Sequence, residues 1–361
     1  MNAFLESIWR ALRGKKGLKE ISPPVRVEAA PEKLKGLTCL EQLSDKEPTV
    51  AAIKKDLEGK SSVLELMKYY LEKLEGELDN NAPTFVKLAR LFECGATPER
   101  VEGHHYGVAL GLRTGDNKDI GADYRNLLGF VWSTSLGKVP PWVGKTFTTA
   151  TRGELMRLTG GAESGNTPTS LGINHFNEIE DSPLNIASLL FLTFWLNLKD
   201  APENERAAYG YEKIGGQFIA RRARSVYHGT EREVFQLNYR WPQLSNPLPL
   251  KYLIDEIVEI ADGLYLGQLL FATKRLWQEY DPKLPDGEYD YGHFGYFLLM
   301  DDSWKTEARK VFPYIGIPYP ERPKQVPQPG KFTAFTFADP PQGNCRDHLL
   351  AEIHNDMKGK E

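Results

Sequence analysis

Two adjacent histidines, His104 and His105, are the side chains of this sequence whose type and setting best suit chemistry. An imidazole can bind a metal or haem iron, and it exchanges protons near neutral pH. The surrounding run, 101–112, is rich in glycine and alternates weakly, which predicts a β-strand. Neighbouring side chains of a strand point to opposite faces, so at most one of the two histidines faces a buried interior. A structural alternative is a buried histidine that hydrogen-bonds to backbone or tyrosine.

His293 is a further histidine candidate, within the aromatic run 289–300 that also predicts a strand. No HxxxH or HExxH spacing in the sequence supports a metal site built from these histidines. The same structural alternative, a histidine packed in the core, therefore applies to His293.

The neighbouring carboxylates Asp255 and Glu256 fall on a predicted strand, so they face opposite ways and cannot act as a paired acid and base. We expect Asp255 to form a structural ion pair, near Tyr239 or Arg240. The segment 144–146, Gly-Lys-Thr, is similar to the end of a phosphate-binding loop. The glycine that this pattern needs five residues earlier is Val139, so we expect no phosphate loop.

The elements that must position these side chains begin with helices. Residues 61–78 have apolar side chains at helical spacing after a capping box of Ser62 and Glu65, and a second helix is predicted over about 84–93. Residues 1–17 combine an apolar stripe with basic side chains. That pattern is typical of a helix that docks on a membrane surface or on a protein.

Strands dominate the rest of the chain. Extended segments are predicted over 142–149 and 233–241, and 253–273 contains two strands around a turn at 261–263. A helical insertion is predicted over about 150–219. The segment from 318 to 361 is expected to be a proline-rich extended tail with a short terminal helix.

Three segments, read in order, resemble a known family. They are residues 97–107, 141–147 and 239–267, and together they resemble the GxWxG family followed by its associated domain of unknown function. The resemblance implies a mostly antiparallel, lipocalin-like β-barrel and no particular activity. His105 stands where the family has its central tryptophan, an interior position, which makes His105 the candidate metal ligand.

The predicted fold class is therefore α+β. A helical N-terminal region, residues 1–95, precedes an antiparallel, calycin-like β-barrel body over 96–317, and the tail covers 318–361. In a closed barrel of eight strands the interior holds side chains or one small ligand.

Composition excludes several classes of protein. The chain has 45 Lys and Arg against 49 Asp and Glu, a net charge of −4, so we expect no nucleic-acid partner. Hydrophobic residues make up 41%, which argues against disorder. Three separated cysteines fit a reducing compartment. The start is not a secretory signal, and the most apolar run, 184–198, is shorter than the about 20 residues of a membrane span, so a cytoplasmic protein is predicted.

Three hypotheses about function follow. The first is a protein that binds a small apolar or aromatic molecule, lipid-like or haem-like, in the barrel. The second is a haem- or metal-dependent enzyme that uses His105 or His293 in the same cavity, although the sequence identifies no reaction. The third is an interaction protein that docks through residues 1–17. The residues expected to contact a ligand are His105, Tyr106, Trp142, Tyr239, Tyr265 and His293.

Overall fold

A computed structural model gives the arrangement of most of the chain up to residue 315. The residues it describes are 36–41, 43–74, 82–112, 142–163, 167–177, 198–227, 230–247, 250–276, 278–313 and 315. The chain divides into two units, Met1–Arg322 and Pro323–Glu361, and the description covers residues of the first unit alone. The helix predicted over 1–17, the tail 318–361 and the apolar run 184–197 lie outside the described residues.

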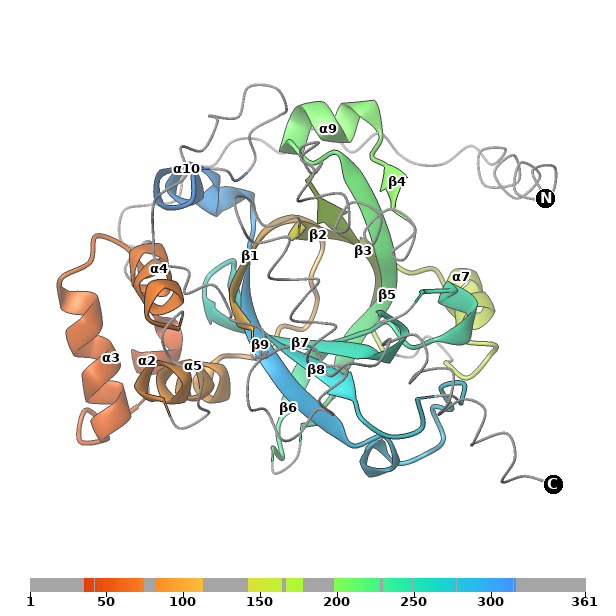
Figure 1. Cartoon of the computed structure of the whole chain (residues 1–361), viewed down its shortest axis with the longest axis horizontal. Coiled ribbons are helices and arrows are strands. Elements are labelled where there is room, and N and C mark those ends of the chain that lie inside the picture. The colour runs from red at the N-terminus through yellow and green to blue at the C-terminus, as the bar shows by residue number, and fades with distance from the viewer. Residues whose placement is uncertain are drawn as a thin grey trace, which may run out of the picture. The chain divides into compact units, whose positions relative to one another are not determined.

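Eight antiparallel strands close into a barrel, seen end-on in Figure 1. The strands are β1 (Gly103–Leu112), β2 (Trp142–Thr149), β3 (Thr169–Phe176), β5 (Lys213–Arg224), β6 (Glu233–Asn238), β7 (Leu253–Ala261), β8 (Leu264–Ala272) and β9 (Tyr291–Met300). Each strand pairs with the next, β3 pairs with β5, and β9 returns to pair with β1. The two-residue β4 (Lys199–Asp200) pairs with the edge of β5. The predicted α+β class with a barrel body is confirmed.

Alternation along the strands gives the barrel two different faces. One set of side chains forms an aromatic cluster in the interior, and it includes Phe147, Phe218, Phe235, Phe271 and Phe297. The side chains on the opposite face of each strand, such as Val108 of β1 and Leu298 of β9, point out of the barrel and pack against the helices in a second hydrophobic cluster. Interior glycines admit the largest rings: a Cβ on Gly172 would overlap Phe218, and one on Gly267 would overlap Phe297. Aromatic side chains therefore line the interior.

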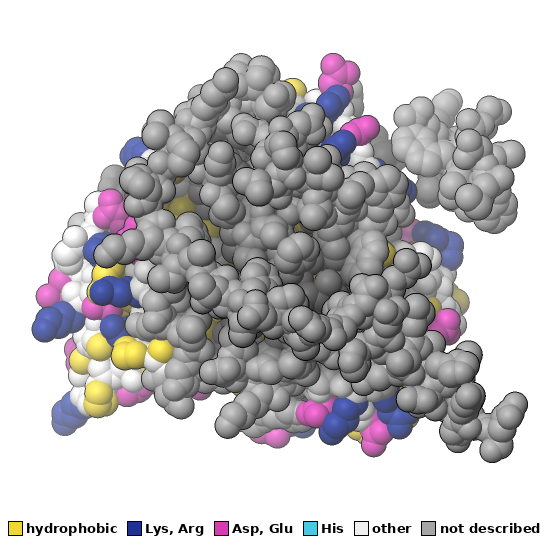
Figure 2. Space-filling view, viewed as in Figure 1, with side chains coloured by type: hydrophobic (Ala, Val, Ile, Leu, Met, Phe, Trp, Pro, Cys, Tyr) yellow, Lys and Arg dark blue, Asp and Glu magenta, His cyan; other side chains and the backbone are white. Residues whose placement is uncertain are grey.

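The helical layer covers one side of the barrel (Figure 1). It consists of α2 (Thr38–Glu41), α3 (Pro48–Glu58), α4 (Val63–Leu74), α5 (Pro83–Cys94) and α10 (Lys305–Val311). At the start of α4 the Ser62 hydroxyl accepts a hydrogen bond from the N–H of Glu65 at 3.3 Å, which is one half of the predicted capping box. The Glu65 carboxylate accepts from the N–H of Ser61 in place of that of Ser62. Arg232, just before β6, donates to the carbonyls of Phe92, Glu93 and Gly95 and so fixes the end of α5 to the barrel. Figure 2 shows basic and acidic side chains interspersed over this layer.

The predicted elements match the structure closely outside one region. The extended segment 142–149 is β2, and the two strands around the turn 261–263 are β7 and β8. Residues 150–219, predicted as a helical insertion, contain α7 (Arg152–Leu158) and α9 (Glu203–Tyr209), and they also supply β3 and the start of β5. β3 lacks an apolar alternation because it places Ser170 and Asn174 in buried positions. Among the described helices, none is long and apolar enough to cross a lipid bilayer.

Candidate functional site in the barrel interior

A buried polar cluster lies inside the barrel, and Lys145 is at its centre. Lys145 projects from β2, and its Nζ lies 2.6 Å from Asn174 Oδ1, 2.6 Å from Tyr239 Oη and 2.9 Å from Asp255 Oδ2. These acceptors come from β3, from the residue after β6 and from β7, so barrel closure is what brings them together. Each of the three N–H groups of the ammonium has one acceptor.

The partners of Lys145 are also bonded to one another. Tyr239 donates its hydroxyl proton to Asp255 Oδ2 at 2.8 Å, and Trp142 donates its indole N–H to Asn174 Oδ1 at 3.0 Å. The amide of Asn174 in turn donates to the carbonyl of Gly216 at 2.8 Å. The cluster is therefore a connected network that fixes the orientation of each side chain.

Aromatic rings enclose the Lys145 ammonium on several sides. The ring centroids of Trp142, Phe218, Tyr239 and Phe297 lie 5.0–5.4 Å from Nζ, within the range of cation–π attraction. The side chains of Lys145 and Asp255 are 3% and 2% exposed. A charged pair with so little water contact depends on these protein contacts for its stability.

Burial and the neighbouring carboxylate act on the Lys145 charge in opposite directions. Burial lowers the pKa of Lys145, and Asp255 counters part of that effect. For Tyr239, burial and the Asp255 charge together raise the pKa well above its ordinary value. Tyr239 therefore keeps its proton at neutral pH and stays a hydrogen-bond donor to the carboxylate.

One atom of the cluster has an unused bonding capacity. Oδ2 of Asp255 accepts from Lys145 and Tyr239, while Oδ1, equally buried, has no hydrogen-bond partner among the described residues. A buried acceptor without a partner is costly, and it marks a place where a donor would bind favourably. The interior thus offers an aromatic wall with one free acceptor.

Four of the residues predicted to contact a ligand lie in this interior. Trp142 and Tyr239 belong to the polar cluster itself. His105 packs edge-on against Tyr265 and Phe147, with centroid separations of 5.5 and 5.4 Å. Burial lowers the pKa of His105 to about 4, so its imidazole is neutral at pH 7.

The other two predicted residues lie on the outer side of the barrel wall. His293 packs against Phe85 of α5 and Tyr296, with centroids 5.5 and 4.6 Å apart. Tyr106 belongs to the cluster that joins the barrel to the helices. His105 and His293 therefore do not face a common cavity. Across the described residues, no group of three or more His, Cys, Asp or Glu side chains is arranged to hold a metal ion.

Two members of the cluster, Lys145 and Asn174, were not predicted as site residues. The sequence points to Lys145 only within a segment similar to the end of a phosphate-binding loop, and Asn174 lies in the predicted helical insertion 150–219. A usable signal exists for Lys145, because it shares a strand face with Phe147 two residues later. A lysine on the apolar face of a strand needs a buried acceptor, and Asp255 is the one it meets. The predicted ion pair of Asp255 near Tyr239 therefore includes Lys145.

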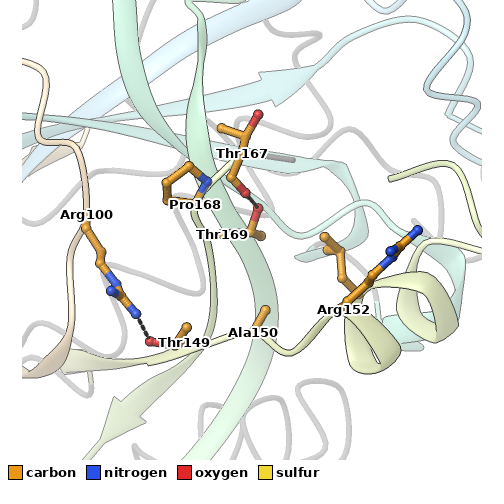
Figure 3. A pocket seen from close by; sticks show the side chains of 8 residues that line it. Arg100, Thr149, Ala150, Arg152, Thr167, Pro168 and Thr169 are labelled. Carbon is orange, nitrogen blue, oxygen red and sulfur yellow. Dashed lines mark hydrogen bonds between the residues drawn. The ribbon is translucent and has the colours of Figure 1, made fainter. Parts of the chain in front are cut away.

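A surface hollow of about 240 Å³ lies between Arg100, the end of β2, the start of α7 and the start of β3 (Figure 3). Arg100 donates to the hydroxyl of Thr149 and forms an ion pair with Glu102 at 2.6 Å. Its charge is thus already compensated, whereas the exposed Arg152, the second arginine that lines the hollow, forms no ion pair among the described residues.

No family model, no curated protein and no solved structure matches this chain. The antiparallel barrel is the part of the GxWxG resemblance that the structure bears out. Membership of that family stays a prediction.

Proposed function

We propose that the barrel binds a small apolar or aromatic molecule that carries a hydroxyl or N–H group. The ligand donates a hydrogen bond to Oδ1 of Asp255, and its body lies against the interior aromatic rings. The observation that carries this proposal is the free, buried acceptor of Asp255 inside an aromatic interior. Pockets for small molecules combine mostly apolar walls with a few placed polar groups, and this interior has that composition.

The charges of the cluster favour a neutral donor over an acid. Every N–H group of Lys145 already has an acceptor, so a ligand carboxylate would find no free donor there. It would also meet the Asp255 charge at close range, which is repulsive in a water-poor interior. A hydroxyl or N–H group, in contrast, supplies the one hydrogen bond that the cluster lacks.

A matched pair of ligands tests the proposal. 2-Naphthol carries an O–H donor, and 2-methoxynaphthalene has the same ring system with an acceptor in its place. We expect the wild-type protein to bind 2-naphthol about tenfold more tightly, because a buried acceptor left unpaired costs about 1–3 kcal/mol. Fluorescence titration of the purified protein measures both affinities.

The variant Asp255→Asn makes the test specific to the site. Its amide oxygen can keep the hydrogen bonds from Lys145 and Tyr239, and its NH₂ group then replaces the free acceptor by a donor. We expect the preference between the two ligands to reverse, with Asp45→Asn in the exposed part of the helical layer as the control that leaves it unchanged. Equal binding of both ligands to the wild type, or no binding of either, would refute the proposal.

A further inference from the structure

A second candidate site lies outside the barrel interior, where the chain leaves β6. A pocket of about 190 Å³ is lined by Arg240, Trp241, Asn246, Lys251, Tyr252 and Tyr280, among others. Lys251 and Glu279 also line the pocket, but both are exposed and their charges offset each other. The charge inside the pocket therefore comes from Arg240, and its apolar surface comes from the aromatic side chains.

Arg240 is a buried cation without a paired acid. The residue is 3% exposed, and its guanidinium lies 4.0 Å from the ring centroid of Tyr289, 4.9 Å from Tyr280 and 5.4 Å from Tyr291. No carboxylate of the described residues forms an ion pair with it. Asp286 is near enough for Arg240 to act on its pKa, but burial outweighs that effect and raises the pKa of this carboxyl group.

The hydrogen bonds of the guanidinium leave one edge unused. Nη1 donates to the hydroxyl of Tyr291, whereas Nε is buried and has no partner, and Nη2 makes no hydrogen bond within the described part of the chain. Nε and Nη2 form the edge of a guanidinium that matches the two oxygens of a carboxylate. A buried charge without a counter-ion is unfavourable, so an anion placed on this edge would be strongly favoured.

Backbone strain gathers around the same pocket. Three described non-glycine residues have left-handed backbone: Ser245 with φ 53°, Asp290 with φ 54° and Arg275 with φ 55°. Ser245 lines the pocket, and Asp290 lies between two tyrosines that surround Arg240. Arg275 donates to Gln278, another lining residue, at 2.7 Å. Such strain is kept where the surrounding structure requires a specific geometry, as at ligand sites.

We propose that this pocket binds a small aromatic carboxylate. The carboxylate pairs with Nε and Nη2 of Arg240, and the ring of the ligand packs against the aromatic walls formed by Trp241, Tyr252 and Tyr280. This site is separate from the Asp255 acceptor, and it selects for the opposite ligand chemistry, an anion instead of a neutral donor.

Calorimetric titration of the purified protein with benzoate tests the proposal. We expect one benzoate per chain. Benzamide, which has the same shape without the charge, should bind at least tenfold more weakly, because it lacks the opposite charge and its single oxygen cannot pair with both N–H groups. Inorganic phosphate should not displace benzoate, because it lacks a ring. Equal binding of benzamide, or displacement by phosphate at similar concentration, would overturn the assignment.

Substitutions then locate the site. Arg240→Lys keeps the charge and loses the planar edge, and we expect it to weaken benzoate binding at least tenfold. Arg100→Gln removes an arginine from the other surface hollow and should leave binding unchanged. Should Arg240→Lys fail to fold, the wild-type spectrum decides the matter. Benzoate should then shift one arginine Nε–H resonance in a ¹⁵N–¹H spectrum, and an unshifted spectrum would overturn the proposal.

Discussion

The two faces of the barrel wall bury polar side chains by different means. Inside, Lys145 of β2 is a cation held by three hydrogen bonds, one of which is also its ion pair with Asp255. Outside, His104 of β1 and His175 of β3, the strands on either side of β2, lie in a stack of rings with Tyr209 and Tyr211. The centroid separations in this outer stack are 5.1 Å between the histidines, 4.0 Å from His104 to Tyr209 and 3.7 Å from His175 to Tyr211.

This difference shows that a buried group keeps its charge only where its polar atoms have bonding partners. The interior keeps a charge because every polar atom of the ammonium has a partner. In the outer stack neither ring nitrogen of His175 has a hydrogen-bond partner among the described residues, and burial lowers the pKa of both histidines well below the ordinary value. On β3, Asn174 thus belongs to the charged network on one face, and His175 belongs to the neutral stack on the other.

Breaking the interior ion pair is expected to have the largest effect. Asp255→Leu leaves the Lys145 ammonium buried without its acid, and we expect a loss of about 3–5 kcal/mol in the free energy of unfolding, measured by urea denaturation at pH 7. The double variant Lys145→Met with Asp255→Leu removes both charges and should recover much of that loss. A single-variant loss below about 1 kcal/mol would mean that the pair contributes no more than a surface ion pair.

The sequence predicts only those strands whose own residues carry a recognisable pattern of apolar side chains. The pattern of two largely apolar runs around the turn at 261–263 locates β7 and β8 closely. No such pattern marks β3, whose interior positions hold Ser170 and Asn174 as partners for other segments. These side chains are polar because of contacts made with distant strands. The pattern along the sequence therefore places β3 within the predicted helical insertion 150–219.

The composition of the site was predictable only in part for the same reason. Trp142, Tyr239 and Asp255 were expected near the interior, yet the lysine that joins them lies 94 positions before Tyr239 and 110 before Asp255. Closure of the barrel between β1 and β9 creates that proximity. Strand order, which the sequence does not specify, is thus the information that was missing.

Crowding the interior should have the next largest effect. Gly172→Ala adds a Cβ that overlaps the ring of Phe218, and overpacking of this kind costs about 1–3 kcal/mol, measured by the same urea denaturation. Gly153→Ala in α7 is the matched control, since a Cβ there meets no atom within 4 Å. Replacing the ring by a smaller side chain, with Phe218→Leu in the Gly172→Ala background, should restore part of the lost stability. An equal effect of the two alanine substitutions would show that the interior has free room at this point.

The smallest expected effect concerns the outer stack and depends on pH. His175 is neutral in the folded protein, because burial lowers its pKa, while in the unfolded chain it titrates near 6.5. Its contribution to stability is therefore fully present above pH 6.5 and is lost as the pH falls below that value. At pH 6 the loss is about 0.8 kcal/mol for this one group.

The ring-for-ring variant His175→Phe isolates that contribution. Urea denaturation at pH 7.5 and at pH 6 should show that the variant loses about 0.8 kcal/mol less than the wild type between the two values. The other buried groups that titrate, His104 and His105 with lowered pKa and Glu256 with a raised one, are present in both proteins, so their effects largely cancel. Identical losses would mean that His175 is protonated in the folded protein, and the outer stack would then be a charged cluster like the interior one.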